Sequence, residues 1–257
     1  MDSNSNLPEP AAGVPAPVLE EAQAKAPGKK TLGEIFSKAL EIYSENPIMI
    51  VPSLVPIAAL ILGLVLFAGF VGVAAILGGG GLLALSALGS LLLFVIILIV
   101  LFFMAEGVTI EMIKEASAGN KADLNLAWEA SKGKMEPLIL SSILAGIITV
   151  LGYILLIIPG IILSVVFYFV AQAVMIDGKS GMEALKTSYN FVKENVSDAV
   201  IIIIVSAVIS IVLPTIPLIG ALLSLIALPY IYALATLFYM DRNEMPPGKQ
   251  ETKVDIA

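Results

Sequence analysis

Three acidic residues stand at similar places in the chain, where long apolar stretches give way to polar sequence. Glu106, Asp177 and Asp241 each follow a methionine by one or two residues. Carboxylates that gather at a membrane surface can hold a metal ion or take part in proton transfer. Their similar placement indicates that the three side chains could converge as a cytoplasmic ring, and we expect a solvated rim there rather than a metal site.

The composition removes most other routes to catalysis. The chain contains no histidine and no cysteine, so it lacks the commonest general base and transition-metal ligand and has no thiolate nucleophile. The sequence also contains no nucleotide-binding or hydrolase motif of the Walker, GxGxxG or GxSxG type. We therefore expect a protein that is not an enzyme and that uses no metal or other cofactor.

The elements that carry these acids are expected to be membrane helices. Of the 257 residues, 58% are hydrophobic and 14% are charged, and the mean hydropathy is +0.99. Soluble domains are about 45–50% apolar and about 25% charged. Residues 200–209 are apolar without alternation, which argues against a transmembrane barrel and for spanning helices.

Three long stretches contain no Asp, Glu, Lys or Arg: Asn46–Ala105, Pro137–Ile176 and Ala199–Met240. One helical crossing needs roughly 20 apolar residues, so each stretch can cross a bilayer, turn and return. The first stretch also has room for three crossings. That alternative would place the later lysines on the opposite side from Lys29 and Lys30, and we therefore favour two crossings per stretch and six in all.

Turn residues near the middle of each stretch support the hairpins. Gly78–Gly81 interrupt the first stretch, Ile158–Gly160 the second and Pro214–Gly220 the third. Glycine and proline are the strongest local breakers of a helix. Pro52 and Pro56 are expected to kink or delay the first spanning helix.

A short amphipathic helix is expected before each hairpin. Thr31 with Glu34 and Ser180 with Glu183 have capping-box spacing, and Asp123 can cap a helix between them. Apolar residues follow each start at helical spacing. We expect these helices to lie in the headgroup layer on the cytoplasmic side, although an ordinary soluble helix is the alternative for the first.

The similar starts, turns and exits predict an internal repeat of one amphipathic helix and one hairpin. The expected bounds are residues 31–242 for a six-helix membrane domain, with repeats at about 31–118, 119–178 and 179–242. The tails, residues 1–30 and 243–257, have few large apolar side chains, so we expect them to be disordered. The first tail lacks the pattern of a signal peptide.

The basic residues predict the orientation. All 14 Lys and Arg residues lie in the tails or in the polar segments that face one side of a six-crossing protein. By the positive-inside rule that side is cytoplasmic. We expect a multi-pass protein of the cell membrane with both termini in the cytoplasm.

Several segments resemble a known group of membrane proteins. Residues 31–47, 177–188 and 238–242 are similar to sequences of six-helix prokaryotic, largely archaeal, membrane proteins related to the membrane domain of some glycerophosphoryl diester phosphodiesterases. The resemblance covers roughly residues 31–242 and implies the six-helix fold. It implies no phosphodiesterase activity, because the chain has no histidine and no soluble segment long enough for that domain.

The expected function is therefore non-enzymatic. We expect an integral membrane protein that acts by lipid or partner binding through its cytoplasmic amphipathic layer. The alternative is a carrier for a lipid or another apolar solute, with a pathway between repeats near the proline kinks. The expected partners are membrane lipids and an unidentified membrane or cytoplasmic protein, and no nucleic acid.

Overall fold

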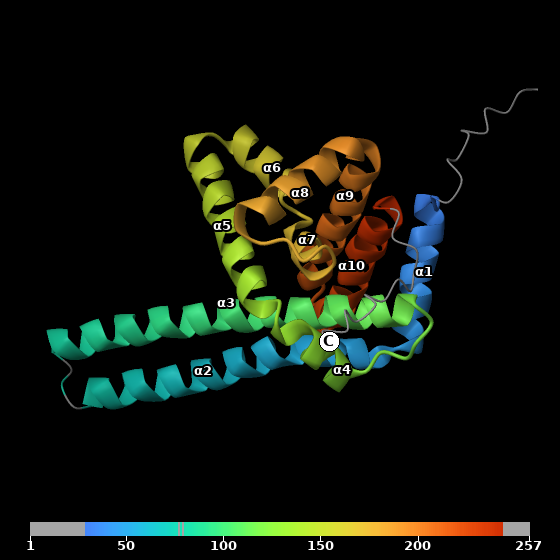
Figure 1. Ribbon diagram of the computed structural model, residues 1–257. Helices are drawn as coiled ribbons and strands as arrows, with labels where there is room; N and C mark the ends of the chain where they lie inside the picture. Colours follow the sequence, from blue (N-terminus) through green and yellow to red (C-terminus); the bar gives the residue numbers. More distant parts are fainter. Residues whose placement is uncertain (1–28, 77, 79, 244–257) are drawn as a thin grey trace, which may run out of the picture.

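The computed structural model describes residues 29–76, 78 and 80–243, which form helices joined by short turns (Figure 1). No β-strand occurs within these residues, so the all-α prediction is confirmed. The α-helices are α1 (Leu32–Glu45), α2 (Val51–Ile76), α3 (Gly81–Ser117), α4 (Leu124–Lys132), α5 (Met135–Leu155), α6 (Ile157–Val166), α7 (Val170–Met175), α8 (Gly181–Glu194), α9 (Val196–Val212) and α10 (Gly220–Arg242); the 3₁₀ helices are η1 (Pro47–Ile50) and η2 (Leu213–Thr215). The predictions for most of both tails and for residues 77 and 79 lie outside the described part.

Six segments of the described chain are long and apolar enough to span a membrane. They are Pro47–Val73, Leu85–Ser117, Met135–Leu155, Ile157–Met175, Val196–Thr215 and Gly220–Arg242. Helix α2 contacts α3, α5 contacts α6 and α9 contacts α10, while α10 also packs on α1 and α3. In Figure 1 the α2–α3 pair runs across the direction of α5, α9 and α10 and projects beyond them.

The amphipathic helices begin where the sequence predicts. Thr31, Asp123 and Ser180 are the N-cap residues of α1, α4 and α8. The capping box of Thr31 and Glu34 is present, and the Asp123 carboxylate accepts bonds from two backbone amides. Each start therefore has a local cause in the sequence, although the third differs in detail.

The predicted capping box at Ser180 is wrong. The Ser180 hydroxyl makes no capping bond, and the Glu183 carboxylate instead pairs with Lys179 at 2.6 Å. The first backbone amide of α8, that of Gly181, donates to the hydroxyl of Ser141 on α5 at 2.7 Å. A tertiary contact thus replaces the local one that the sequence pattern favoured.

Helices α1 and α8 are built alike. Both have 14 residues and end at an asparagine, Asn46 or Asn195. Each asparagine side chain donates to the carbonyl four residues earlier, on Ile42 or Phe191, at 2.9 Å. Their apolar faces are covered by protein, since α1 packs on α10 and α8 packs on α5 and α7. These faces are therefore occupied rather than free to enter the headgroup layer.

The second predicted turn lies earlier than expected. Helix α5 ends at Leu155, and Leu156 is extended, with φ −160° and ψ 149°. Pro159 lies in the first turn of α6, where backbone N–H groups make no hydrogen bond within the helix. The missing N–H of proline therefore costs nothing there. The break therefore precedes Ile158–Gly160, because proline begins a helix as readily as it ends one.

A second break in this stretch has no counterpart in the sequence prediction. Helix α6 ends at Val166 and α7 begins at Val170. The fully buried hydroxyl of Ser188 on α8 donates to the Val166 carbonyl at 2.7 Å and accepts from the Phe169 amide at 3.2 Å. A side chain from another helix thus replaces part of the interrupted backbone ladder, since buried backbone groups need partners.

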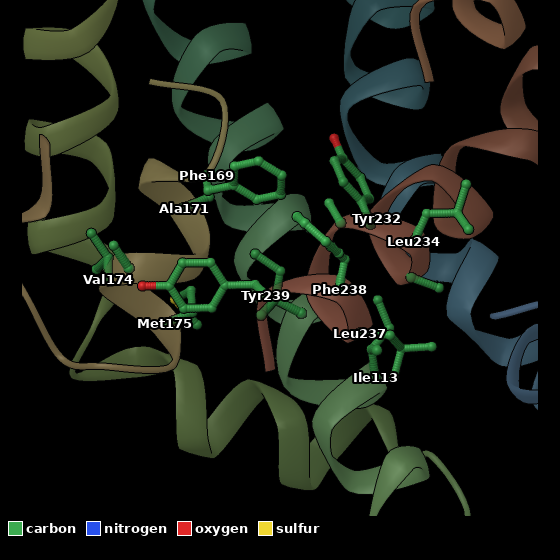
Figure 2. Close-up of a cluster of buried hydrophobic side chains, with 14 of the residues drawn as sticks. Ile113, Phe169, Ala171, Val174, Met175, Tyr232, Leu234, Leu237, Phe238 and Tyr239 are labelled. Atoms are coloured by element: carbon green, nitrogen blue, oxygen red, sulfur yellow. The ribbon is translucent and has the colours of Figure 1, made fainter. Parts of the chain in front are cut away.

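The core lies where α7, α8 and α10 meet. Phe169 is fully buried, with ring centroids 4.9 Å from Phe191 and 5.7 Å from Phe238. Tyr239 lies 4.5 Å from Phe191, and Figure 2 shows its ring reaching from α10 toward Val174 and Met175 of α7. Such aromatic pairs add about 0.5–1.5 kcal/mol beyond the area they bury. This cluster fixes the end of α10 against the interrupted span.

Candidate functional site

The three acids predicted to form a rim have different surroundings. Glu106 lies on α3, Asp177 between α7 and α8, and Asp241 in the last turn of α10, and each is partly buried rather than fully exposed. No group of three His, Cys, Asp or Glu side chains that could hold a metal ion occurs in the part of the chain that the structure describes. The three acids therefore do not form a metal-binding group within the described residues.

Asp177 is bound by the core. The Tyr239 hydroxyl donates to its carboxylate at 2.5 Å. Burial raises the pKa of Asp177 above its ordinary value, while this hydrogen bond and the charge of Lys179 act in the opposite direction. The carboxylate therefore ties the α7–α8 turn to α10.

Asp241 belongs to an ionic cluster at the end of α10. It pairs with Arg242, and it accepts from the backbone amide of Lys30 at 3.1 Å. Arg242 also bonds Asp198 of α9 at 2.8 Å and the Lys30 carbonyl at 3.1 Å, and its guanidinium lies 5.2 Å from the centre of the Phe238 ring. The Arg242 side chain is only 7% exposed, so this cluster fastens the start of α1 and the start of α9 to α10.

A second ionic cluster was missed by the sequence reasoning. The buried Glu111 carboxylate accepts from Lys114 and from Lys134, each at 2.9 Å. Lys134 also donates to the Met175 carbonyl at the end of α7, at 2.7 Å. The Glu111–Lys114 spacing of three residues on a helix was a local signal. Lys134, which precedes α5, bonds to residues of α3 and α7. No local sequence pattern predicted these contacts, because the three segments are far apart in the chain.

Glu106 differs from the other two acids. It lies inside the candidate span Leu85–Ser117, and its carboxyl group has no hydrogen bond or ion pair with any described residue. The hydroxyl of Ser206 on α9 is buried and has no hydrogen bond within the described residues.

An apolar groove opens between α2, α9 and α10. Its volume is about 270 Å³. It is lined by Ile57, Ile209, Ser210, Leu213, Ala221, Ser224, Leu225, Ala227, Leu228 and Ile231. All of these residues belong to candidate membrane spans, so the groove lies between the first and the last hairpin. Its lining carries two hydroxyls and no charge, which suits an aliphatic ligand rather than a polar one.

The fold and these sites define a class: an all-helical protein with six candidate membrane spans and charged clusters that fasten its helices. That class is multi-pass membrane protein. Residues 127–241 match the model of a family described as a domain of unknown function (DUF7847). No curated protein and no solved structure matches the chain. The matched segment runs from α4 to the end of α10 and contains two of the three predicted acids.

Proposed function

We propose that the protein crosses the cell membrane six times with its charged segments and both termini in the cytoplasm. The placement of all 14 basic residues supports this orientation. Because the chain has no cysteine, a single cysteine in place of Gly80 can be labelled without background. It should react with an impermeant reagent only from outside, and labelling from the cytoplasmic side would reject the proposed crossing count.

We also propose that the polar and apolar elements repeat and that the resemblance to the membrane domain of glycerophosphoryl diester phosphodiesterases reflects a shared fold. Helices α1 and α8 support a repeat, because both have 14 residues, both begin at the predicted N-cap and both end at an asparagine. Helix α4, with nine residues, is shorter than both, so the middle unit is the most divergent of the three.

We propose that the protein is not an enzyme and that it binds membrane lipid. The groove between α2, α9 and α10 is the observation that carries this function, because an uncharged groove inside candidate spans faces acyl chains. The amphipathic layer is a weaker lipid site, since the apolar faces of α1 and α8 pack against other helices. The groove therefore replaces that layer as the proposed acyl-chain site.

The test compares two Ala→Trp variants in the purified full-length protein. Ala227→Trp places a large ring in the groove wall, whereas Ala207→Trp places the same ring on an exposed position of α9 that does not line the groove. Native mass spectrometry should show co-purified phospholipid on the wild type and on Ala207→Trp, and several-fold less on Ala227→Trp. Equal lipid loss in both variants, or no retained lipid in the wild type, would contradict the proposal.

A carrier for a lipid or another apolar solute is the second candidate function. Pro56 precedes the groove residue Ile57, and Pro229 lies inside α10 between two groove residues. Proline removes a backbone hydrogen bond and makes a helix easier to bend. A carrier should speed lipid exchange between the leaflets of reconstituted vesicles and lose that activity in Ala227→Trp. Retained lipid with no exchange would leave binding alone as the function.

A further inference from the structure

Building on the lipid-binding function proposed above, we propose that the groove between α2, α9 and α10 holds a single acyl chain. The chain belongs to a phospholipid of the leaflet opposite the charged ends of α9 and α10. With the orientation proposed above, that is the outer leaflet. The position of the groove on the α9–α10 hairpin, its size and its lining each support this assignment.

The groove lies at the uncharged end of the α9–α10 hairpin. At the other end, Asp198 in the first turn of α9 pairs with Arg242 in the last turn of α10, at 2.8 Å. The groove residue Ile209 lies 11 residues after Asp198, and Ile231 lies 11 residues before Arg242. At about 1.5 Å per residue, the groove begins about 16 Å from that ion pair, past the middle of a bilayer core of about 30 Å. The chain of a lipid beside the ion pair would therefore end where the groove begins.

The length of the groove matches the depth of one leaflet. On α10 the lining runs from Ala221, near the start of the helix, to Ile231, near its middle. Ten helical steps separate these two residues, which corresponds to about 15 Å, or half of the bilayer core. An acyl chain that enters beside the α9–α10 turn can thus lie along α10 with its methyl end near Ile231.

The volume of the groove suits one chain rather than a whole lipid. At about 270 Å³, it lies just below the range of about 300–1,000 Å³ that is typical of pockets for drug-sized ligands. A phospholipid with two chains and a headgroup is larger than such a ligand. One chain therefore occupies the groove, while the second chain and the headgroup stay in the surrounding bilayer.

The lining is suited to the chain and not to the headgroup. The sequence contains no Asp, Glu, Lys or Arg from Ala199 to Met240, so the α9–α10 turn supplies no charged partner for a phosphate or an amine. The Ser224 hydroxyl donates to the Gly220 carbonyl of its own helix at 2.7 Å, so its hydrogen atom is already bonded. Phospholipids that carry the same chains should therefore bind equally well whatever their headgroup.

Photoactivatable phospholipids test the direction of the bound chain. Two probes carry a diazirine on one acyl chain, near its carboxyl end in the first probe and near its methyl end in the second. After irradiation of the full-length protein in nanodiscs, peptide mass spectrometry should place adducts of the first probe near Ala221 and adducts of the second near Ile231. The reverse order, or no order, would overturn the assigned leaflet but leave lipid binding in the groove intact. No groove adducts with either probe would contradict lipid binding as well.

The two tryptophan variants separate lipid in the groove from lipid on the surface. Ala227→Trp should lose the ordered adducts several-fold, and Ala207→Trp should keep them. Adducts on Ile211, which is 68% exposed and does not line the groove, report surface lipid and should persist in both variants. If Ala227→Trp keeps the ordered adducts, they come from surface lipid and the assignment is wrong.

Competition in the wild type tests the single chain and the headgroup, and it needs no variant to fold. Unlabelled phosphatidylcholine and phosphatidylglycerol with the same chains should suppress the groove adducts equally. Lysophosphatidylcholine, which has one chain, should do so at a similar concentration. A several-fold preference for one headgroup would overturn recognition through the chain alone, and a several-fold weaker effect of the lysolipid would overturn the single chain.

Discussion

The α2–α3 hairpin and the unit formed by α5–α10 are similarly apolar but are held in different ways. In the most apolar stretch of α10, 50% of the residues are buried inside the protein. In the corresponding apolar stretches of the spans that contain α2 and α3, none are buried. Helix α2 packs mainly on α3, although it also contacts α10; helix α3 also contacts α1, α4, α5, α7 and α10, and helix α10 contacts α1, α2, α3, α7 and α9. Hydrophobicity thus identifies both as membrane segments, but only tertiary contacts show which one forms the protein core.

The family match follows the same division. Residues 127–241 cover α5–α10 almost completely and leave out the hairpin. Most specific contacts lie in or against that unit. They are the ionic clusters of Glu111 and Arg242, the aromatic cluster, and the hydrogen bond from Ser188 to the Val166 carbonyl. Most of the specific contacts described above therefore lie in or against the segment that matches the family, although Glu111 itself belongs to α3.

The largest expected difference in stability between the two regions comes from replacing a phenylalanine in each, Phe169 in the core and Phe102 in the hairpin. Phe169→Ala should lower the free energy of unfolding by about 3–5 kcal/mol, because Phe169 is fully buried among four other rings. Phe102→Ala on α3, where the ring is 44% exposed, should cost about 1 kcal/mol or less. Thermal unfolding in one detergent compares the two variants. Equal losses would mean that the hairpin contributes as much to the core as α7 does.

A smaller difference is expected at serine. Ser188→Ala removes both the donor to Val166 and the acceptor for the Phe169 amide, and should cost about 1–3 kcal/mol. The exposed hydroxyl of Ser90 on α3 bonds only to the Ala87 carbonyl of its own helix, so Ser90→Ala should be close to neutral. Hydrogen exchange at Phe169 should also accelerate in Ser188→Ala. If it stays slow, Ser188 does not hold the break.

The smallest expected effect is the pH dependence from Asp177. Since burial raises its pKa above the ordinary 3.8, the folded state binds this proton more tightly than the unfolded state does. Ionisation of Asp177 therefore lowers the stability of the folded state. The loss begins as the pH rises past the unfolded-state pKa and is complete above the folded-state pKa. Relative to Asp177→Asn, which still accepts from Tyr239, the wild type should have a lower Tm at about pH 7 than at about pH 4. A difference independent of pH would reject this assignment.

Local signals predicted the helices well and the tertiary contacts poorly. Thr31 and Asp123 marked helix starts because their capping bonds lie within four residues. The break at Phe167–Phe169 depends on Ser188, some 20 residues away and on another helix. The rim of three acids stays a prediction; within the structure, Asp177 and Asp241 have different partners and Glu106 lies within the candidate span Leu85–Ser117. Similar spacing in the chain did not specify similar surroundings.

Helix α3 joins the two regions as one rod. Its 37 residues run from Gly81 to Ser117 without a proline or a break, which gives a length of about 55 Å against a bilayer core of about 30 Å. One end lies in the hairpin and the other carries Glu106 and Glu111. Because no proline or break interrupts α3, we expect a change in the tilt of the hairpin to move the segment that carries those two carboxylates as well. We therefore expect the thickness of the surrounding membrane to affect the orientation of α3.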